Sequence, residues 1–203
     1  EMEGYDNSEL MTNSAGTMDK LYRRLYIQSK SYDEVFELVK KKAELLASIP
    51  AIQPITKRSI ARLASGFGYR IHPIYKTSIM HEGIDFSAPI GTEIYATGNG
   101  TVAKTEYNGR GYGNNVVINH GFGYNTLYGH MSRFAVRPGQ KIKRGDIIGY
   151  VGNTGSSTGP HVHYEVWKNG KKIDPINFFF NDLSAEEYDK IRELASQSNQ
   201  SFD

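Results

Sequence analysis

Residues 159–166 read GPHVHYEV, and this stretch indicates the fold class and the chemistry to look for. Its alternation of valine and tyrosine with polar residues favours a β-strand that begins just after the Gly-Pro turn. Because successive side chains of a strand point to opposite faces, His161 and His163 would share a face, roughly 6–7 Å apart. Two imidazoles at this spacing fit a metal site, a proton-transfer site or a satisfied pair of buried polar groups.

The region around this stretch has the composition of an all-β domain. Nineteen of the 21 glycines lie between Gly66 and Gly170, whereas residues 17–65 contain none. Short runs of β-forming residues are separated by Gly-Asn, Gly-Phe-Gly and Asn-Gly turns. We therefore predict a mainly β fold, a compact antiparallel β-sandwich or β-roll over residues 64–180.

Helical patterns flank the predicted β domain. We expect residues 1–16 to be disordered and residues 17–50 to form a helical arm. Apolar residues recur every seven positions along this arm, at Met18, Leu25, Tyr32, Val39 and Leu46. The capping-box spacing of residues 31–34 allows two helices in place of one. Residues 51–63 are expected to be a linker, and residues 181–203 a tail with a short C-terminal helix that begins at the Ser184–Glu187 capping box.

Composition narrows the classes of function. The net charge is only +2, and the absence of cysteine excludes disulfides, thiol nucleophiles and cysteine-type zinc sites. Basic residues are scattered and no stacking-aromatic motif is present, so we expect no nucleic-acid partner. No apolar run is long enough to span a membrane and no signal peptide is visible. The opening EMEGYDN does not look like a natural start, and we expect a targeting segment, with the option of a membrane anchor, to precede it.

All six histidines lie in the predicted β domain. His72 stands beside a proline and His120 ends a strand at a turn, so we expect structural roles for both. In HEGIDFSAP, His81 and Asp85 would lie roughly 13 Å apart along a straight strand. Zinc ligand atoms lie only about 2 Å from the metal, so sharing one ion requires a bend, which Gly83 would permit.

A further histidine, His130, could belong to the same site as these residues. His130, in TLYGHM, ends another strand-like run. Geometry alone leaves open whether His161 and His163 both bind a metal or whether one of them handles protons. As a set, four histidines and one aspartate at strand-to-turn boundaries favour a catalytic zinc site.

Three segments carry a resemblance to a known family. They are HEGIDFSAPIGTEIYATGNGTV, LYGHM and VRPGQKIKRGDIIGYVGNTGSSTGPHVHYEV, and together they closely resemble the lysostaphin/LytM-type zinc endopeptidases, which cleave peptide cross-links in bacterial peptidoglycan. The resemblance extends over residues 64–179, its HxxxD plus HxH signature is highly specific, and it implies the duplicated hybrid motif fold. It also implies that His81, Asp85 and His163 bind one Zn²⁺, while His130 and His161 flank the fourth coordination position.

The resemblance further implies how such a site works. Three protein ligands leave one position for a water, whose pKa the zinc lowers. We expect His161 to be the general base, and His130 to stabilise the oxyanion or to share the proton transfer. Tyr75 is expected to line the substrate groove, as a tyrosine at that place does in relatives. From the glycine, serine and threonine content alone, residues 152–159 are expected to be a flexible loop at the mouth of the site, whose hydroxyl groups either bond substrate or simply lie on the surface.

The resemblance also implies substrate and location. We expect an endopeptidase that acts on peptidoglycan peptide stems in the periplasm or cell envelope of a bacterium, with the D-alanine–diaminopimelate bond as its target. Two alternatives stay open: a non-catalytic LytM-like regulator of a cell-wall amidase, and a histidine phosphocarrier of similar β topology. The arm either restrains activity by docking over the groove, forms an oligomer through its apolar stripe, or acts as a spacer.

Overall fold

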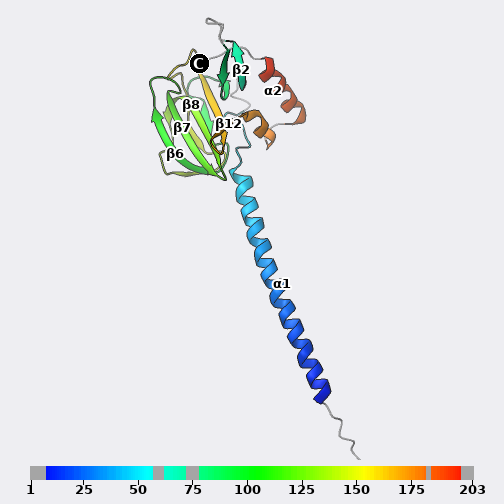
Figure 1. Ribbon diagram of the computed structural model, residues 1–203. Helices are drawn as coiled ribbons and strands as arrows, with labels where there is room; N and C mark the ends of the chain where they lie inside the picture. The colour runs from blue at the N-terminus through cyan, green and yellow to red at the C-terminus, as the bar shows by residue number, and fades with distance from the viewer. Residues whose placement is uncertain (1–7, 57–61, 72–77, 182–183, 198–203) are drawn as a thin grey trace, which may run out of the picture. The chain divides into compact units, whose positions relative to one another are not determined.

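The computed structural model describes residues 8–56, 62–71, 78–181 and 184–197 (Figure 1). The chain divides into two compact units, Glu1–Glu44 and Leu45–Asp203. In its described part, the first unit consists of helix α1, Ser8–Ser48, whose last residues belong to the second unit. Neither this helix nor the other described helix contains a stretch apolar and long enough to span a lipid bilayer.

The second unit is built from antiparallel strands. The described strands are β1 (Arg62–Ser65), β2 (Gly68–Ile71), β3 (Ser78–His81), β4 (Ile84–Ser87), β5 (Glu93–Tyr95), β6 (Gly100–Tyr107), β7 (Asn114–Gly121), β8 (Tyr124–Phe134), β9 (Lys141–Ile142), β10 (Ile147–Val151), β11 (His161–Lys168) and β12 (Lys171–Ile173). Ten of them form one sheet with the order β1-β4-β11-β8-β7-β6-β9, in which β10 pairs with β5 and β8, and β12 with β11. Strands β2 and β3 form a separate pair. The expected mainly antiparallel β fold is confirmed.

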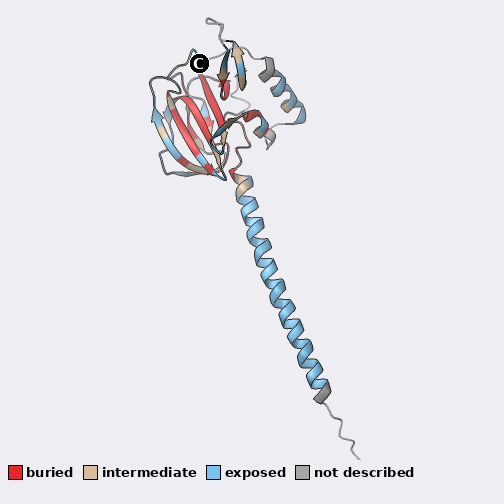
Figure 2. Cartoon of the chain, viewed as in Figure 1, coloured by how far each residue is buried: buried red, intermediate tan, exposed pale blue. Residues whose placement is uncertain are grey.

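Strand β11 lies inside the large sheet, and the side chains that it places on one face differ in type from those that it places on the other. Val162, Tyr164 and Val166 are fully buried in the hydrophobic core, as the alternation of side chains requires. The intervening residues, which begin with His161 and His163, therefore point to the opposite face. Figure 2 shows buried residues along the central strands of the sheet, and the first six residues of β11 are buried.

The segments that flank the sheet differ from the sequence expectations. Helix α1 is continuous and begins at Ser8, so residues 8–16 are helical rather than disordered, and the capping-box spacing at residues 31–34 does not divide the helix. Residues 51–55 do not form a free linker, because Ala51 and Ile55 are buried against the β domain. The Ala51 N–H donates to the Thr97 carbonyl at 3.0 Å.

Arg144 fixes the C-terminal end of α1 within the second unit. The last carbonyls of a helix have no partner inside the helix. Here the Arg144 guanidinium donates to the carbonyls of Leu46 at 2.7 Å, Ala47 at 3.1 Å and Ile49 at 2.8 Å. These bonds satisfy groups that the helix leaves open, and they attach its end to the β domain.

The C-terminal helix forms as its sequence predicts. The 3₁₀ helix η1, Pro175–Asn181, places Phe179 in the core. Helix α2, Ala185–Gln197, follows it. The Ser184 hydroxyl accepts from the Glu187 N–H at 3.2 Å, and the Glu187 carboxylate accepts from the Ser184 N–H at 2.8 Å. This reciprocal pair is the predicted capping box.

His120 has the structural role that the sequence indicates. Its ring bonds the Asn99 carbonyl and the Thr126 hydroxyl, both at 2.8 Å, and Thr126 in turn bonds the buried Tyr128 hydroxyl at 3.1 Å. Burial, the largest cause, lowers the pKa of His120 to about 4, and the charge of Arg144 acts in the same direction.

This shift predicts a pH dependence of stability. The folded state binds a proton on His120 less readily than the unfolded state, so the contribution of the neutral ring is complete above about pH 6.5 and is lost as the pH falls towards 4. The loss amounts to about 3 kcal/mol, at about 1.4 kcal/mol per pKa unit. Urea unfolding between about pH 7 and pH 4 should therefore show a steeper decline in wild type than in His120→Gln. Equal slopes would contradict this role.

Candidate metal centre and active site

The HEGID segment bends as a shared metal site requires. Strand β3 ends at His81 and β4 begins at Ile84, so the chain passes from the small sheet to the large one at Glu82 and Gly83. A Cβ atom on Gly83 would lie 2.6 Å from the Tyr164 carbonyl oxygen and 2.8 Å from the His163 ring. Only glycine fits this close approach, and the bend expected at this residue is confirmed.

The bend brings together three groups that could hold one metal ion, His81, Asp85 and His163. His163 lies directly opposite Asp85 in the β11–β4 register. The Asp85 Oδ1 atom is 2.8 Å from His163 Nδ1 and 3.2 Å from His81 Nε2, and these two nitrogens are 3.2 Å apart. Ligand atoms of a tetrahedral zinc lie about 3.3 Å apart, given bonds of about 2.0–2.1 Å. The three buried groups therefore have the spacing of one metal site.

The protonation of His81 supports a cation at this position. Its Nδ1 lies 2.7 Å from the Gly66 carbonyl oxygen, which can only accept, so Nδ1 carries the hydrogen. In the neutral ring, Nε2 then has a lone pair that faces the Asp85 carboxylate at 3.2 Å. Two acceptors at this distance repel each other unless a proton or a metal ion lies between them. The residues present fit a metal ion.

Asp85 is held as an anion. Burial alone would raise its pKa, but the two imidazoles beside it, His163 and His81, outweigh burial and hold the pKa well below its usual range. Its Oδ2 atom is buried without a hydrogen-bond partner in the part of the chain that the structure describes. A buried carboxylate oxygen left in this state is rare, and metal coordination accounts for it.

His130 reaches the site through a β-bulge. Asn114 pairs with Met131 and Val116 with Tyr128, so two residues of β8, Gly129 and His130, face one residue of β7. His130 has a φ of 58°, in the left-handed region that non-glycine residues rarely adopt. Such a bulge redirects a side chain and is common beside active sites. Here it places the His130 ring centroid 4.5 Å from that of His161.

The segment 152–159 orients both of these histidines. The His130 Nδ1–H donates to the Thr154 carbonyl at 2.7 Å, and the His161 Nδ1–H donates to the Gly159 carbonyl at 2.8 Å. In each neutral ring, Nε2 then carries the lone pair. The His161 Nε2 lies 3.9 Å from Asp85 Oδ1, beside the three metal-binding groups. Burial is the largest cause that lowers the pKa of His130 to about 4, so this ring is neutral at neutral pH.

The same segment is not the flexible loop that the sequence suggested. The Thr154 hydroxyl accepts from the Asn114 N–H at 3.0 Å and donates to the Met131 carbonyl at 2.9 Å. The Ser156 hydroxyl accepts from the Gly111 N–H at 3.0 Å, and the Ser156 N–H donates to the Gly111 carbonyl at 2.9 Å. The Thr154 hydroxyl donates its only hydrogen within the protein, so it cannot also donate to substrate; a substrate bond from Ser156 stays a prediction.

The structure thus gathers five of the six site residues selected from the sequence: His81, Asp85, His130, His161 and His163. The sixth, Tyr75, lies outside the described residues, as does His72.

Comparison with known proteins identifies the family. The profile of Peptidase family M23 matches residues 79–175, which include all five residues. The fold superposes on the catalytic domain of the prophage-encoded M23 protein EnpA from Enterococcus faecalis, with a TM-score of 0.55, 36% identity, and coverage of 62% of this chain and 95% of that domain. The chain belongs to peptidase family M23.

Two further proteins resemble this M23 chain. A zinc-containing peptidase from Vibrio cholerae matches with a TM-score of 0.58 and 37% identity, over 65% of this chain and 40% of that one. The peptidoglycan DD-endopeptidase ShyA of Vibrio cholerae serotype O1 is 46% identical over 116 residues, which is 57% of this chain and 27% of that protein. The chain spans about a quarter of the length of the curated relatives it matches.

A buried carboxylate supports one metal-binding group of this M23 site. Glu165 Oε1 accepts from His163 Nε2 at 3.2 Å and from the Tyr112 hydroxyl at 2.6 Å, while Oε2 accepts from the Trp167 indole N–H at 2.6 Å. The Lys172 ammonium donates to Glu165 at 3.1 Å. Burial would raise the pKa of Glu165, but His163 and the other donors outweigh it and lower the pKa to about 2.

Sequence reasoning missed this network, although one signal was present. Glu165 follows His161 and His163 with the same period of two, so it lies on the same face of β11. Tyr112 and Lys172 carried no such signal. Burial and the bond to Glu165 raise the pKa of Tyr112 to about 12, so it remains a donor at neutral pH. Glu82 stays half-exposed and forms an ion pair with Lys172.

We expect Glu165→Gln to weaken metal binding by about 10–100-fold, the usual effect of removing the partner of a metal-binding histidine. Glutamine keeps the size of the side chain but loses the charge that orients and polarises the His163 ring. The measurement is the metal dissociation constant by competition with a chelator, with circular dichroism to check folding. The control is Glu106→Gln, at a surface ion pair with Lys104. Equal affinities of the two variants would refute the role.

Proposed function

We propose that this chain is a zinc-dependent endopeptidase that hydrolyses the peptide cross-links of bacterial peptidoglycan. One observation carries the proposal: three metal-binding groups converge, and two further histidines present ring nitrogens beside them. The name of its relative ShyA, a peptidoglycan DD-endopeptidase, supports the substrate.

The donor set supports zinc as the metal. Two imidazole nitrogens and one carboxylate oxygen, from His81, His163 and Asp85, are typical of catalytic zinc sites, which keep one further position open. When bound, zinc would polarise the scissile carbonyl and lower the pKa of a water molecule. The similar zinc-containing peptidase of Vibrio cholerae supports this choice.

His161 is proposed as the general base. The Gly159 carbonyl fixes its Nδ1 hydrogen, so Nε2 is ready to accept a proton on the side of Asp85. A base in this position takes the proton from the attacking water and delivers it to the leaving amine. The backbone at His161 is held on both sides, because His161 pairs with Ser87 of β4 and forms an isolated β-bridge with Gly152.

His130 is proposed to stabilise charge after it receives a proton. The Thr154 carbonyl fixes its Nδ1 hydrogen, so the neutral ring offers only an acceptor at Nε2. A neutral His130 therefore cannot donate to an oxyanion, whereas the protonated ring can. The close His161 ring, 4.5 Å away between centroids, makes proton sharing between the two histidines geometrically reasonable.

We propose that the bond cleaved is the D-alanine–diaminopimelate cross-link and that the enzyme works in the bacterial cell envelope. The sequence that precedes the metal-binding segment resembles that of Gram-negative envelope members, and the relative's name specifies a DD-endopeptidase. The two alternatives gain no specific support. A regulator has no need of a complete site, and a phosphocarrier has no need of Asp85.

Digestion of purified peptidoglycan tests this function. Zinc-loaded protein is incubated with sacculi, and the released peptides are separated and identified by mass. We expect cross-linked dimers to disappear, with a new amine on diaminopimelate and a new carboxylate on D-alanine. Cleavage at another peptide bond would refute the bond assignment alone. No peptide cleavage by the zinc-loaded protein would refute the proposed activity.

A further inference from the structure

Helix α1 carries an apolar stripe that the first unit leaves exposed. Its residues form two series. Within each series the residues are spaced by seven positions or a multiple of seven, and the second series lies three positions after the first. The residues are Met18, Leu21, Leu25, Tyr32, Val35 and Val39, and each side chain is at least 50% exposed. Figure 2 shows exposure along nearly the whole helix. A long helix is stabilised mainly by burying such a stripe, so its exposure calls for a partner.

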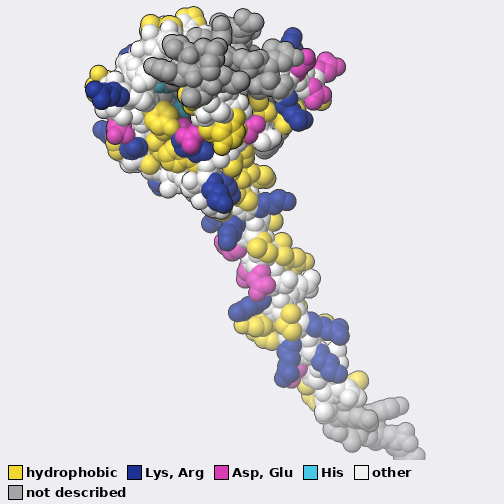
Figure 3. All heavy atoms as spheres, turned by 45° about the horizontal axis from the view of Figure 1, so that its top comes forward, with side chains coloured by type: hydrophobic (Ala, Val, Ile, Leu, Met, Phe, Trp, Pro, Cys, Tyr) yellow, Lys and Arg dark blue, Asp and Glu magenta, His cyan; other side chains and the backbone are white. Residues whose placement is uncertain are grey.

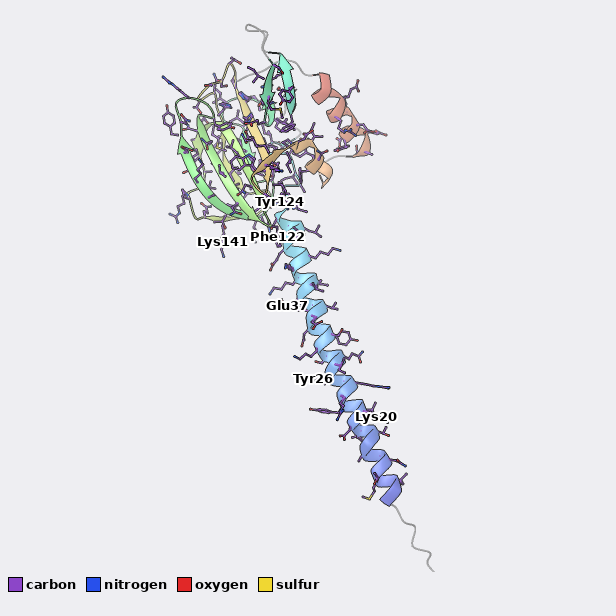
Figure 4. All side chains as sticks on the ribbon, viewed as in Figure 1. Lys20, Tyr26, Glu37, Phe122, Tyr124 and Lys141 are labelled. Atoms are coloured by element: carbon purple, nitrogen blue, oxygen red, sulfur yellow. The ribbon has the colours of Figure 1, made fainter. Side chains whose placement is uncertain are left out.

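Most of the charge lies away from the stripe, although Lys42 continues the Leu21–Val35 series. The Met18 series consists of Met18, Leu25, Tyr32 and Val39. Positions one, two or five places after its members lie on the opposite face of the helix, and ten of the 12 charged residues between positions 18 and 44 occupy such positions. Five of these are acidic and five are basic. Figures 3 and 4 show hydrophobic and charged side chains projecting along α1, with Lys20 and Glu37 labelled among the charged ones. A membrane-surface helix would instead carry mainly lysine and arginine on its polar face.

The repeat of seven also indicates what kind of partner covers the stripe. A straight helix has 3.6 residues per turn, so residues seven apart drift around its axis by about 20° per repeat. They stay on one contact line only when helices wind around each other. The seven-residue repeat therefore favours another helix over a flat sheet or a lipid surface.

The middle of the stripe suits burial between helices. Gln28 continues the Leu21–Val35 series, and its Nε2 donates to the Tyr32 hydroxyl at 3.2 Å. This bond satisfies one donor of Gln28 and the hydroxyl oxygen of Tyr32 within one helix, which lowers the cost of removing them from water. A polar residue at such a position commonly fixes the register of paired helices.

We propose that α1 forms a coiled coil with a second copy of this chain. Met11 and Leu46 extend the same series, giving eight apolar side chains per helix. At about 60–120 Å² each, two helices would bury about 1,000–1,900 Å², which is the range of a specific interface of about 1,200–2,000 Å². The partner helix is already present in a second copy, with the same stripe and the same balanced charge.

A matched pair of substitutions tests the proposal on the full chain. Leu25 is 68% exposed and lies on the stripe, whereas Ile27 is 67% exposed and lies on the charged face. Light scattering after gel filtration, over a wide range of concentrations, should give at least twice the 22.8 kDa of the single chain. Leu25→Glu should raise the dissociation constant by at least about tenfold, because each interface gains two buried charges. Ile27→Glu should leave it unchanged.

Each result decides the question. Because both positions are solvent-exposed in the single chain, neither substitution should unfold the helix, and circular dichroism checks this. A wild-type monomer at every concentration would overturn the proposal and would leave the chain's own β domain or a membrane as the partner of the stripe. An oligomer that both variants weaken equally would also overturn it, because the contact would then not follow the stripe.

Discussion

Asp85→Ala is expected to abolish metal binding and cleavage together. Asp85 Oδ1 lies close to three of the four histidines of the site: it is 2.8 Å from His163, 3.2 Å from His81 and 3.9 Å from His161. Its charge offsets that of the metal, so its loss should weaken metal binding by more than the roughly 10–100-fold caused by losing a supporting residue. Activity should fall to the level without enzyme, because the nucleophile depends on the metal.

Metal content by mass spectrometry and turnover on a cross-linked muropeptide measure both effects. The control is Asp146→Ala, at an exposed turn where the carboxylate accepts from the Lys143 N–H. Removal of Asp85 should leave the fold intact, because His81 keeps its bond to the Gly66 carbonyl and His163 keeps its bond to Glu165. A variant that retains one metal per chain and wild-type turnover would contradict the assignment of the metal-binding residues.

The second prediction with a large effect distinguishes the roles of the two histidines in HVH, His161 and His163. We expect His161→Ala to reduce kcat by about 10²–10⁴-fold, the usual contribution of a general base, with metal content unchanged. His163→Ala should lose the metal as well as turnover. The two residues share a strand, a face and a side-chain type, so each is the control for the other. Loss of metal from His161→Ala would place this residue among the metal-binding groups and contradict its proposed role.

His130→Ala completes this comparison. We expect a loss of about 10²–10³-fold in kcat with the metal retained, because charge stabilisation at the oxyanion would be missing. Near-normal turnover would show that His130 has only a structural role in the bulge, where its backbone N–H donates to the Tyr112 carbonyl at 2.8 Å.

The strand content and the central residues could be predicted because their signals are local. The alternation in HVHYEV fixes which side chains share a face, and the structure places Val162 and Tyr164 in the core on the other face. The bend at Gly83 followed from distance alone, since His81 and Asp85 cannot share a metal along a straight strand. The family signature then specified which groups come together.

The supporting network could not be predicted because its contacts join segments distant in sequence. Tyr112 and Lys172 reach Glu165 from opposite sides along the chain, 53 positions before it and 7 after it. The carbonyl of Thr154 meets His130 from 24 positions away. Turn-rich composition suggested a flexible segment at residues 152–159, but these non-local bonds hold it in place.

The boundaries of the arm were misjudged for a related reason. Residues 51–55 follow Pro50 and contain Pro54, so they look like a linker, yet Ile55 is buried in the core. Packing of this kind depends on the partner surface, which local sequence does not specify. Helix α1 extends to Ser8, and Met11, seven positions before Met18, is the one signal for this extension that the expected start at residue 17 overlooked.

Stepwise metal addition to metal-free protein tests the central claim most directly. The protein is treated with a chelator, and zinc is added back in known amounts while cleavage of cross-linked peptidoglycan peptides is followed. We expect activity to vanish with the metal and to return in proportion to added zinc, up to one ion per chain. Cleavage that persists without metal, or zinc-loaded protein that leaves the cross-links intact, would contradict a zinc endopeptidase built on His81, Asp85 and His163.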